Sequence, residues 1–359
     1  MFLDVLNKRG MHTDFYDDEN WYTLALVRSY KLTKNREFLD KATTTFADIM
    51  GAWDETCCGP NKGGLWWNRS KTSKVTAINA GAVVSASLLY EATKDTKYLE
   101  FAKKAFAYWA THMVDRATGH VYDGISSAGE LNTTWHFTYN EGLFIGACVN
   151  LARVTNDPAP IELAHKVAAY MLRENGQKLP NGKTILSDGK CADDGNGFKG
   201  IGARYLGELY AVDPSHSEYL DALVASADAA YDLARDPATG VVTCDWAGPY
   251  EADAKKSNGA STSSAAVGLA AAAKALGVAT PRLATKYEAE EGNLRGAMGL
   301  EAKYAGFSGW GYVAGWGADG AVDVLVDVPE SGDYVIDLRY STGPDAHRAL
   351  AIDGAEREA

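Results

Sequence analysis

Apolar and polar positions repeat in a helical pattern over most of the chain. Each unit has a helix rich in Ala, Gly and Leu, then a polar turn, a second helix with a one-sided apolar face, and a long loop. Four such units cover residues 20–42, 79–102, 139–164 and 198–223, and a fifth first helix lies within residues 263–277. Small residues on every side of the first helix indicate burial among neighbouring helices, whereas a one-sided apolar face is typical of a helix that faces water.

The repeat predicts a mainly α protein, an α/α toroid in which an outer ring of helices surrounds an inner ring. Every long loop precedes an inner helix, so the loops should gather at the end of the ring where the inner-helix N-termini present free backbone N–H groups. Five inner helices are readable but only four complete outer helices, and residues 1–10 read as the end of a further outer helix. Because an (α/α)6 toroid has six pairs, we expect the first helical hairpin to be missing from this sequence.

The pattern changes to a period of two beyond the helical units, which indicates β-strands. Residues 322–328 and 334–340 alternate in this way on either side of a Pro-Glu-Ser-Gly-Asp turn. We therefore predict a helical domain at residues 1–277, a linker at 278–286 and an incomplete β-sandwich at 287–359, because a complete sandwich needs more strands than this stretch provides.

Composition and charge exclude some partners. No apolar run approaches the roughly 20 residues that span a bilayer, so no membrane span is predicted. The net charge of −12 opposes nucleic-acid binding, because phosphate contacts need clustered Lys and Arg. The 9 Trp and 19 Tyr supply flat apolar faces against which sugar rings pack, and several of them lie in predicted loops or at helix starts.

The five cysteines follow no zinc-binding spacing. Cys148 lies in an apolar helical run and is expected to be buried. Cys191 and Cys244 lie in predicted loops, and the sequence leaves open whether they pair. The seven histidines form no metal-binding pair at helical spacing, and no Ser-His-Asp set for nucleophilic catalysis stands out. We therefore expect no cofactor in catalysis.

Paired carboxylates open one inner helix, at Asp17 and Asp18. Neighbouring residues point about 100° apart around a helix, so both side chains can flank a sugar that lies across the helix end. Two carboxyl groups about 5 Å apart serve retaining glycosidases, and repulsion between them raises one pKa, which leaves an acid beside an ionised nucleophile. The alternative is a plain helix cap, since Asp favours the first turn and Glu19 adds a third acid there.

Further polar and aromatic segments are predicted to lie at the same end of the toroid. Residues 63–68, Gly-Gly-Leu-Trp-Trp-Asn, offer rings and an amide, Asp123 offers an acid, and residues 139–142 offer polar groups. A second acid pair, Asp193 and Asp194, occupies a Gly-rich stretch that reads as a loop. It is suited to a sugar hydroxyl or a cation, although a turn is the more ordinary interpretation.

In their order along residues 1 to about 277, these segments resemble glycoside hydrolase family 76. The resemblance rests on Tyr16-Asp17-Asp18 with Trp21, and on the segments at 63–67, 121–123, 138–142 and 197–205. It implies a retaining endo-α-1,6-mannanase on an (α/α)6 barrel, with α-mannan as the polysaccharide partner and a secreted or cell-surface location.

The resemblance also implies roles for single residues. It makes Asp17 the nucleophile and Asp18 the acid/base. The predicted substrate-binding residues are Trp66, Trp67, Asn68, Asp123, Trp135, Tyr139, Asn140, Phe198 and Lys199. The family often has Gln where this chain has Glu141, so the resemblance assigns that residue no role.

The C-terminal stretch resembles carbohydrate-binding modules of families 6 and 35. The matching segments are residues 287–290, 306–313 and 338–340. The resemblance implies that Glu288 and Glu290 help to hold a structural calcium ion, and that Tyr312 lies near a bound sugar.

Three alternatives remain open for the function. A mannan transglycosylase would use the same acid pair and exclude water. A sugar epimerase on the same barrel would need histidines at inner-helix starts, where His136 stands alone. A non-catalytic mannan-binding protein would bind the polysaccharide without cleaving it.

Overall fold

The structure is a computed structural model, and it describes residues 10–189, 191–277, 287–304, 311–326, 336, 338–341, 349–352 and 355–357. The chain divides into two compact units, residues 1–281 and residues 282–359. The linker predicted at 278–286 lies outside the described residues, as do residues 1–9, which read as the end of an outer helix. Within the described part of the chain, no helix has both the length and the apolar character needed to cross a membrane.

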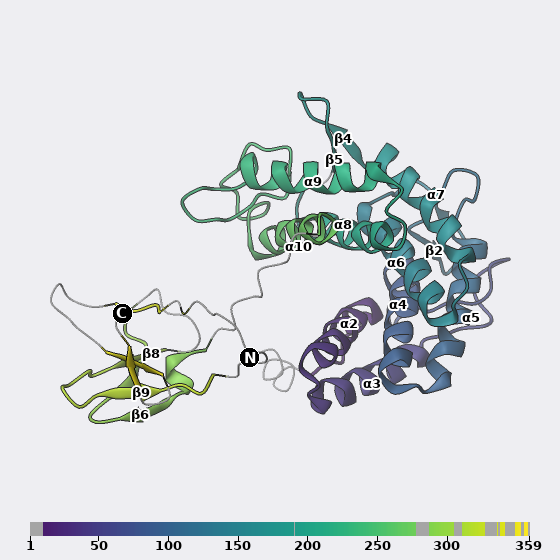
Figure 1. The fold of residues 1–359 in the computed structure, drawn as a ribbon. Coiled ribbons are helices and arrows are strands. Elements are labelled where there is room, and N and C mark those ends of the chain that lie inside the picture. The colour runs from purple at the N-terminus through teal and green to yellow at the C-terminus, as the bar shows by residue number, and fades with distance from the viewer. Residues whose placement is uncertain are drawn as a thin grey trace. The chain divides into compact units, whose positions relative to one another are not determined.

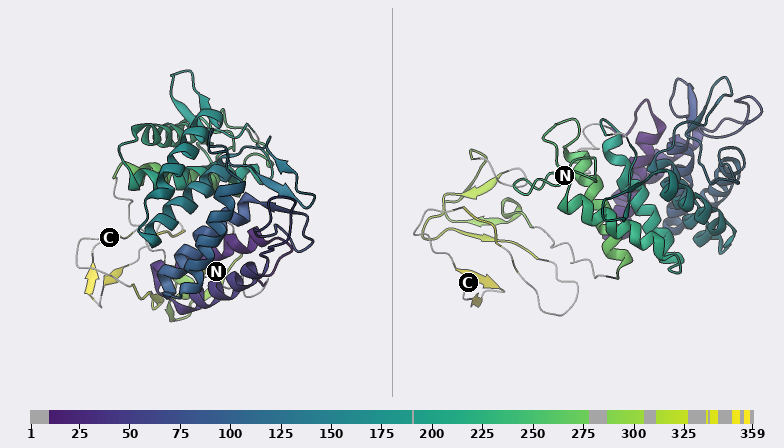
Figure 2. Two further views of the ribbon diagram at one scale, coloured as in Figure 1. Left: turned by 90° about the vertical axis from the view of Figure 1, so that its right-hand side faces the viewer. Right: turned by 90° about the horizontal axis from the view of Figure 1, so that it is seen from above.

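The first unit is a two-layer arc of helices in its described part (Figures 1 and 2). Its inner helices are α2 (Tyr16–Thr33), α4 (Thr76–Thr93), α6 (Thr138–Thr155), α8 (Gly195–Val212) and α10 (Gly259–Ala275). Its outer helices are α3 (Arg36–Gly51), α5 (Thr96–His112), α7 (Ala159–Glu174) and α9 (Ser217–Asp232). Each inner helix packs against the next inner helix along the chain, and the outer helices cover them. These inner and outer helices confirm the predicted repeat of a helical toroid.

A similar turn, which starts with the last residue of the inner helix, leads into the outer helix in each of the first three pairs. The turns are Thr33-Lys34-Asn35, Thr93-Lys94-Asp95 and Thr155-Asn156-Asp157. The middle residue of each turn has a left-handed backbone conformation, which ends the inner helix. The side chain of the third residue then accepts a backbone N–H at the start of the outer helix, and such a cap stabilises a helix by about 1 kcal/mol. The turn residues and the apolar pattern therefore together determine where each inner helix ends and each outer helix begins.

The inner helices pack closely because small residues line their contacts. Helix α6 is buried on every side over residues 140–151, whereas α3 buries a single face. A Cβ atom added to Gly142 would lie 2.8 Å from the Cα atom of Gly202, so the backbones of α6 and α8 touch at this point. A larger side chain at either glycine would force the two helices apart.

The loops that precede α2, α4 and α6 are joined to one another. Their strands are β1 (Ser73–Val75), β2 (Gly124–Ser126) and β3 (Leu131–Asn132), which form one antiparallel sheet in the order β1-β2-β3. Phe15, just ahead of α2, forms an isolated bridge with Asn68 in the loop before β1. The prediction that long loops gather at the inner-helix N-termini is confirmed for these three helices. A separate hairpin of β4 (Gly176–Lys178) and β5 (Thr184–Leu186) lies between α7 and α8.

The second unit contains short antiparallel strand pairs in its described residues. The pairs are β6 (Asn293–Arg295) with β9 (Ala321–Asp323), β7 (Gly299–Glu301) with β8 (Tyr312–Ala314), and β10 (Leu350–Ile352) with β11 (Ala355–Arg357). A short 3-10 turn, Ala289–Glu291, precedes them. The β-sandwich itself stays a prediction.

The two strands predicted at 322–328 and 334–340 differ from what the structure describes. The first ends at Asp323, since residues 324–326 continue without strand pairing. The described residues 336 and 338–340 of the second are not in a strand either. The remaining residues of both strands, and residues 306–310 of the segment that resembles a binding module, lie outside the described residues.

Candidate active site

Asp17 lies in the first turn of α2, with both of its carboxylate oxygens held in place. Its Oδ1 accepts the backbone N–H of Asp18 at 3.2 Å, and its Oδ2 accepts the indole N–H of Trp67 at 3.0 Å. The pKa of Asp17 is raised to about 6, chiefly by burial. The charge of Asp18 contributes to this increase, whereas the hydrogen bond from the Trp67 N–H opposes it. The carboxyl group of Asp17 is therefore fixed in position and titrates close to neutral pH.

Asp18 has different surroundings although it is the next residue. Its side chain is exposed. Partial burial raises the pKa of Asp18, and the charge of Asp194, the residue before α8, adds to the effect. The two neighbouring acids therefore lie in two environments, one against the Trp67 loop and one open to solvent within the field of Asp194.

An ion-pair cluster around Arg69 fixes the start of α2, and the sequence did not predict it. The guanidinium donates to the backbone oxygen of Thr13 at 2.7 Å, to the hydroxyl of Tyr16 at 3.1 Å, to Asp48 at 2.6 Å and to the buried Glu19. It also lies over the Tyr16 ring, 4.5 Å from the centroid. Glu19 is therefore paired structurally and does not join the acid pair. The only sequence signal for Arg69 is its position two residues after Trp67 in the same loop.

Asp123, Tyr139 and Asn140 form one buried polar cluster. Asp123 immediately precedes β2, and its Oδ1 accepts the Tyr139 hydroxyl at 2.8 Å and the Asn140 amide at 3.2 Å. Its backbone oxygen accepts the N–H of Thr76, the first residue of α4, at 2.8 Å. Burial raises the pKa of Tyr139 well above its usual range, and the charges of Asp123 and of Asp17 add to the effect. The structure therefore brings these three predicted residues together on the side of Asp17.

Aromatic rings extend from this cluster toward solvent. The ring of Phe198, in the first turn of α8, lies 4.4 Å from the ring of Tyr139 and 5.3 Å from that of Phe137. Trp135 lies 6.0 Å from Phe137 and is 55% exposed. Of the predicted tryptophans, Trp135 thus presents an open ring face to which a sugar can bind, whereas Trp67 is held by Asp17.

Trp66 and Asn68 differ from the prediction that they contact sugar. Trp66 is 4% exposed, and its indole N–H donates to Asp54 at 3.0 Å, while the Lys74 ammonium lies 4.8 Å from its ring centroid. The amide of Asn68 closes its own loop, since its Nδ2 donates to Thr72 Oγ1 at 2.8 Å and its Oδ1 accepts the Thr72 N–H at 3.1 Å. Both side chains are used inside the protein, where they shape the loop that presents Trp67.

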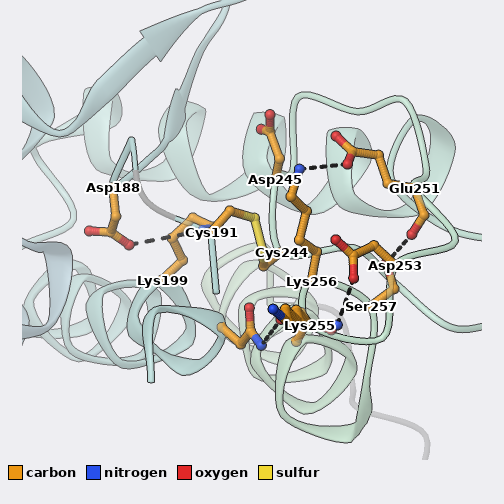
Figure 3. The surroundings of a disulfide bond; sticks show 12 residues. Asp188, Cys191, Lys199, Cys244, Asp245, Glu251, Asp253, Lys255, Lys256 and Ser257 are labelled. Carbon is orange, nitrogen blue, oxygen red and sulfur yellow. Dashed lines mark hydrogen bonds and ion pairs between the residues drawn. A yellow bond between two sulfur atoms is a disulfide. The ribbon is translucent and has the colours of Figure 1, made fainter. Parts of the chain in front are cut away.

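Lys199 points into the protein and not toward a ligand, which corrects the prediction of substrate contact. Its ammonium lies 3.9 Å from Asp188 Oδ2 (Figure 3) and 5.6 Å from the centroid of Trp246. Burial lowers the pKa of Lys199 and raises that of Asp188. Asp188 also accepts the backbone N–H of Thr138 at 2.6 Å and its hydroxyl at 2.9 Å. Asp188 therefore caps α6 from a distant loop, a role that no local sequence signal predicts.

Disulfide bonds join loops of the helical unit. Cys191, before α8, pairs with Cys244, after α9, close to the ion pair of Lys199 (Figure 3), which settles the pairing that the sequence left open. Cys57 and Cys58 also form a disulfide, and Cys148 is buried as predicted.

Helix α8 begins at Gly195, so the Gly-rich stretch after Asp194 is helical, whereas the sequence predicted a loop.

Glu141 is buried in α6 next to Asn140. Its carboxyl oxygens have no side-chain partner among the described residues, and only the backbone N–H groups of Val121 and of Glu141 itself lie nearby. Burial raises the pKa of Glu141 well above its usual range, and the charges of Asp188 and Asp123 add to the effect. Burial therefore favours the uncharged form of this group, which is closer in charge to the Gln that the family resemblance leads one to expect.

In the second unit, the predicted calcium ligands and Tyr312 stay predictions. Glu290 is buried and its Oε1 has no hydrogen-bond partner among the described residues, which fits an oxygen ligand for a hard cation. Glu288 lies just ahead of the 3-10 turn. The hydroxyl of Tyr312 donates to Glu301 at 3.1 Å across the β7–β8 pair.

Comparison with known sequences identifies relatives of the helical unit. A family model described as glycosyl hydrolase family 76 matches residues 4–285. A mannan endo-1,6-α-mannosidase of Candida albicans is 24% identical over 256 residues, which cover 65% of this chain and 56% of the relative. The chain spans about half the length of the curated relatives that it matches.

Solved structures share the arrangement of helices. An α-1,6-mannanase from a Salegentibacter species is 27% identical, with a TM-score of 0.68 over 76% of this chain and 80% of that chain. A variant of the Salegentibacter enzyme, described as inactive, has two aspartates replaced by alanine at consecutive positions and is in complex with α-1,6-mannotetrose. A Listeria innocua protein is 29% identical, with a TM-score of 0.67 over 75% of each chain.

Proposed function

This chain belongs to glycosyl hydrolase family 76, and we propose that it hydrolyses α-1,6-mannosidic linkages within mannan, as a secreted or cell-surface enzyme. One observation carries the proposal. Asp17 and Asp18 share the first turn of an inner helix but differ in burial and in partners, as two carboxyl groups with different tasks require. The activity named for the relatives supports α-mannan as the substrate.

In the proposed mechanism Asp17 is the nucleophile and Asp18 the acid/base. Asp17 attacks the anomeric carbon while Asp18 gives its proton to the glycosidic oxygen, so the C–O bond to the leaving sugar breaks and a mannosyl–Asp17 ester forms. Asp18 then takes a proton from water, whose oxygen attacks the anomeric carbon and releases Asp17. Two inversions give overall retention.

The surroundings of the two acids favour this division of work. The Trp67 N–H and the Asp18 backbone N–H hold Asp17 in one orientation, and above pH 6 its carboxyl group is mostly ionised. Asp18 is exposed in the free protein. A sugar lying over Asp18 removes water from it, which favours the protonated form needed to protonate the leaving oxygen.

Neighbouring groups supply contacts for the mannose units. Asp123 uses its Oδ1 for Tyr139 and Asn140, while among the described residues its Oδ2 has only the long 3.5 Å contact with Asn132. That oxygen is available to accept a sugar hydroxyl. The exposed ring of Trp135 offers an apolar face against which a sugar ring can pack.

Turnover of unbranched α-1,6-mannan by the Asp17→Asn and Asp18→Asn variants tests the proposal. We expect Asp17→Asn to abolish release of oligosaccharides, and Asp18→Asn to lower kcat by about 10²–10⁴-fold. Asp193→Asn, an exposed acid outside the pair, is the matched control and should keep wild-type activity. Wild-type rates in either member of the pair would overturn the assignment.

A second measurement separates the two roles. With a dinitrophenyl glycoside of α-1,6-mannotriose, the leaving group needs no proton, so Asp18→Asn should still form the covalent intermediate. Added azide should then yield the α-mannosyl azide, with retained configuration. A β-azide in the Asp18→Asn variant would instead identify Asp18 as the nucleophile.

Transglycosylation is distinguished by adding an acceptor sugar. The exposure of Asp18 allows water to reach the intermediate, which favours hydrolysis. Products longer than the donor, formed in the presence of mannobiose, would point to a transglycosylase with the same acid pair. Binding of mannan without any product, before and after the Asp→Asn changes, would point to a non-catalytic mannan-binding protein.

A further inference from the structure

We propose that the helical unit binds a zinc ion between His165, Asp213 and His216. His165 lies on α7, Asp213 directly follows α8, and His216 directly precedes α9. Helix α8 has 18 residues and begins at the end where the acid pair lies, so this cluster is about 27 Å away along the helix, at 1.5 Å per residue. The site is therefore separate from the proposed hydrolysis.

The ligand atoms of the cluster converge at a spacing that suits one small ion. His165 Nε2 lies 3.3 Å and His216 Nε2 lies 3.8 Å from Oδ2 of Asp213, and the three residues have ligand atoms within 4.8 Å of one another. Tetrahedral zinc with ligands at about 2.0–2.2 Å places neighbouring ligand atoms roughly 3.3–3.5 Å apart. Both measured separations exceed the usual length of an N–H···O hydrogen bond, about 2.7–3.2 Å.

The atoms that do not face the centre are already engaged by neighbours. Nδ1 of His216 lies 2.8 Å from Glu218 Oε1, and Nδ1 of His165 lies 3.0 Å from the hydroxyl of Tyr219. Oδ1 of Asp213 accepts the Ser215 hydroxyl at 2.6 Å and its backbone N–H at 3.1 Å. Outer-shell partners of this kind orient metal-binding imidazoles and carboxylates. Each of the three residues thus keeps one ligand atom outside these contacts, and the three atoms lie within 4.8 Å of one another.

A second cluster of similar residues shows why this one is favoured. His12, Glu19 and Asp48 also lie close together, but the guanidinium of Arg69 binds both of those acids and supplies the positive charge at their centre. Among the described residues, the ion-pair partners of Asp213 are the two histidines alone. A cation bound at Asp213 therefore displaces no Lys or Arg.

The choice of zinc follows from the donor set. Two imidazole nitrogens and one carboxylate oxygen are ordinary zinc ligands, and three protein ligands leave a fourth position for water. The ion would connect α7 to the turn between α8 and α9. Its ligands His165 and Asp213 are 48 residues apart in the sequence.

Isothermal titration calorimetry of the untagged full chain with ZnCl₂, after treatment with a chelator, tests the site. We expect one zinc ion per chain, and a visible absorption band when Co²⁺ replaces zinc. His165→Gln and His216→Gln should each weaken binding at least about tenfold, and Glu218→Gln, which keeps all three ligands, by about 10- to 100-fold. His112→Gln, at a half-buried histidine on α5, is the matched control and should bind zinc as the wild type does.

The thermal midpoint gives an independent readout, because an ion that binds only the folded chain raises it. Zinc should raise the midpoint of the wild type and of His112→Gln, but not that of His165→Gln. Circular dichroism in chelator establishes that each variant is folded. Absence of zinc binding to the wild type, or unchanged affinity in the His165→Gln/His216→Gln double variant, would overturn the proposal.

Discussion

Replacing Trp67 with Phe should shift the acid limb of the pH–rate profile to higher pH. The indole N–H of Trp67 donates to Asp17 at 3.0 Å and lowers the pKa of Asp17, which burial has raised to about 6. Phe can keep the ring contact with Phe15, whose centroid lies 4.8 Å from that of Trp67, but it has no donor. The pKa of Asp17 should therefore rise further in Trp67→Phe, so that this proposed nucleophile is ionised only at higher pH.

The size of the shift follows from the strength of this hydrogen bond. A hydrogen bond to a charged group contributes about 1.5–3 kcal/mol, and the lower end applies because Trp67 and Asp17 are both partly exposed. Since about 1.4 kcal/mol corresponds to a factor of ten, the ionisation constant of Asp17 should fall about tenfold. At pH 5, where Asp17 is mostly protonated in both proteins, kcat/KM should fall by the same factor, whereas at pH 8 the loss should be small.

The assay is kcat/KM against pH with an α-1,6-linked mannotetraose, paired with a carbon-13 NMR titration of the Asp17 carboxyl group. Trp66→Phe is the matched control, because Trp66 donates a bond of the same length, 3.0 Å, to Asp54, an acid outside the proposed mechanism. That control should keep the wild-type acid limb. An acid limb that stays in place in Trp67→Phe while the Asp17 titration moves would refute the role of Asp17 as the ionised nucleophile.

Three further predictions concern stability. Gly202→Ala should lower the free energy of unfolding by about 1–3 kcal/mol, because its Cβ would lie 2.8 Å from the Cβ of Thr138. Gly197→Ala, in the same helix, should leave it unchanged, because a Cβ at that position would have no atom within 4 Å. Denaturant unfolding compares the two variants. Burial holds the pKa of Glu141 above its value in the unfolded chain, about 4.3, so the free energy of unfolding of the wild type falls as pH rises above that value. The free energy of unfolding of Glu141→Gln should therefore increase relative to the wild type by up to about 1.4 kcal/mol per pH unit. An equal difference between the two proteins at pH 4 and pH 7 would contradict this. Cys191→Ser removes a disulfide and should cost about 2–4 kcal/mol without reductant, whereas equal midpoints with the wild type would mean that the bond contributes nothing.

The helical architecture was predictable because its determinants are local. Residue size around each helix separates inner from outer helices, and contacts such as that between Gly142 and Gly202 need only small residues at a helical spacing. Capping side chains such as Asn35 and Asp95 mark where each outer helix begins. The match to family 76 over residues 4–285 confirms the family resemblance, which rested on short segments in a fixed order.

The roles of loop side chains were less predictable, because loops have no period. Trp66 and Trp67 are neighbours in sequence, yet Trp66 packs under Lys74 inside the protein while Trp67 faces Asp17. The sequence does not show which of the two rings is buried, because this depends on the contact with Lys74. The Lys74 ammonium also donates to the backbone oxygen of Cys57 at 2.6 Å. Strand ends were unpredictable for a related reason: β9 ends at Asp323 where its pairing with β6 ends, and the apolar alternation continues beyond it.

The residues that the sequence missed explain how the proposed site keeps its geometry. Arg69 ties the loop that carries Trp67 to the start of α2, and Asp188 ties a distant loop to the start of α6. Both act at the N-terminus of an inner helix, where backbone N–H groups lack partners within the helix. A catalytic pair must be held to within about 0.5 Å, and loops hold it only when such buried ionic and hydrogen-bonded contacts fix them. Asp17 is therefore held by Trp67, whose loop Arg69 ties to the start of α2, and short sequence segments do not reveal this connection.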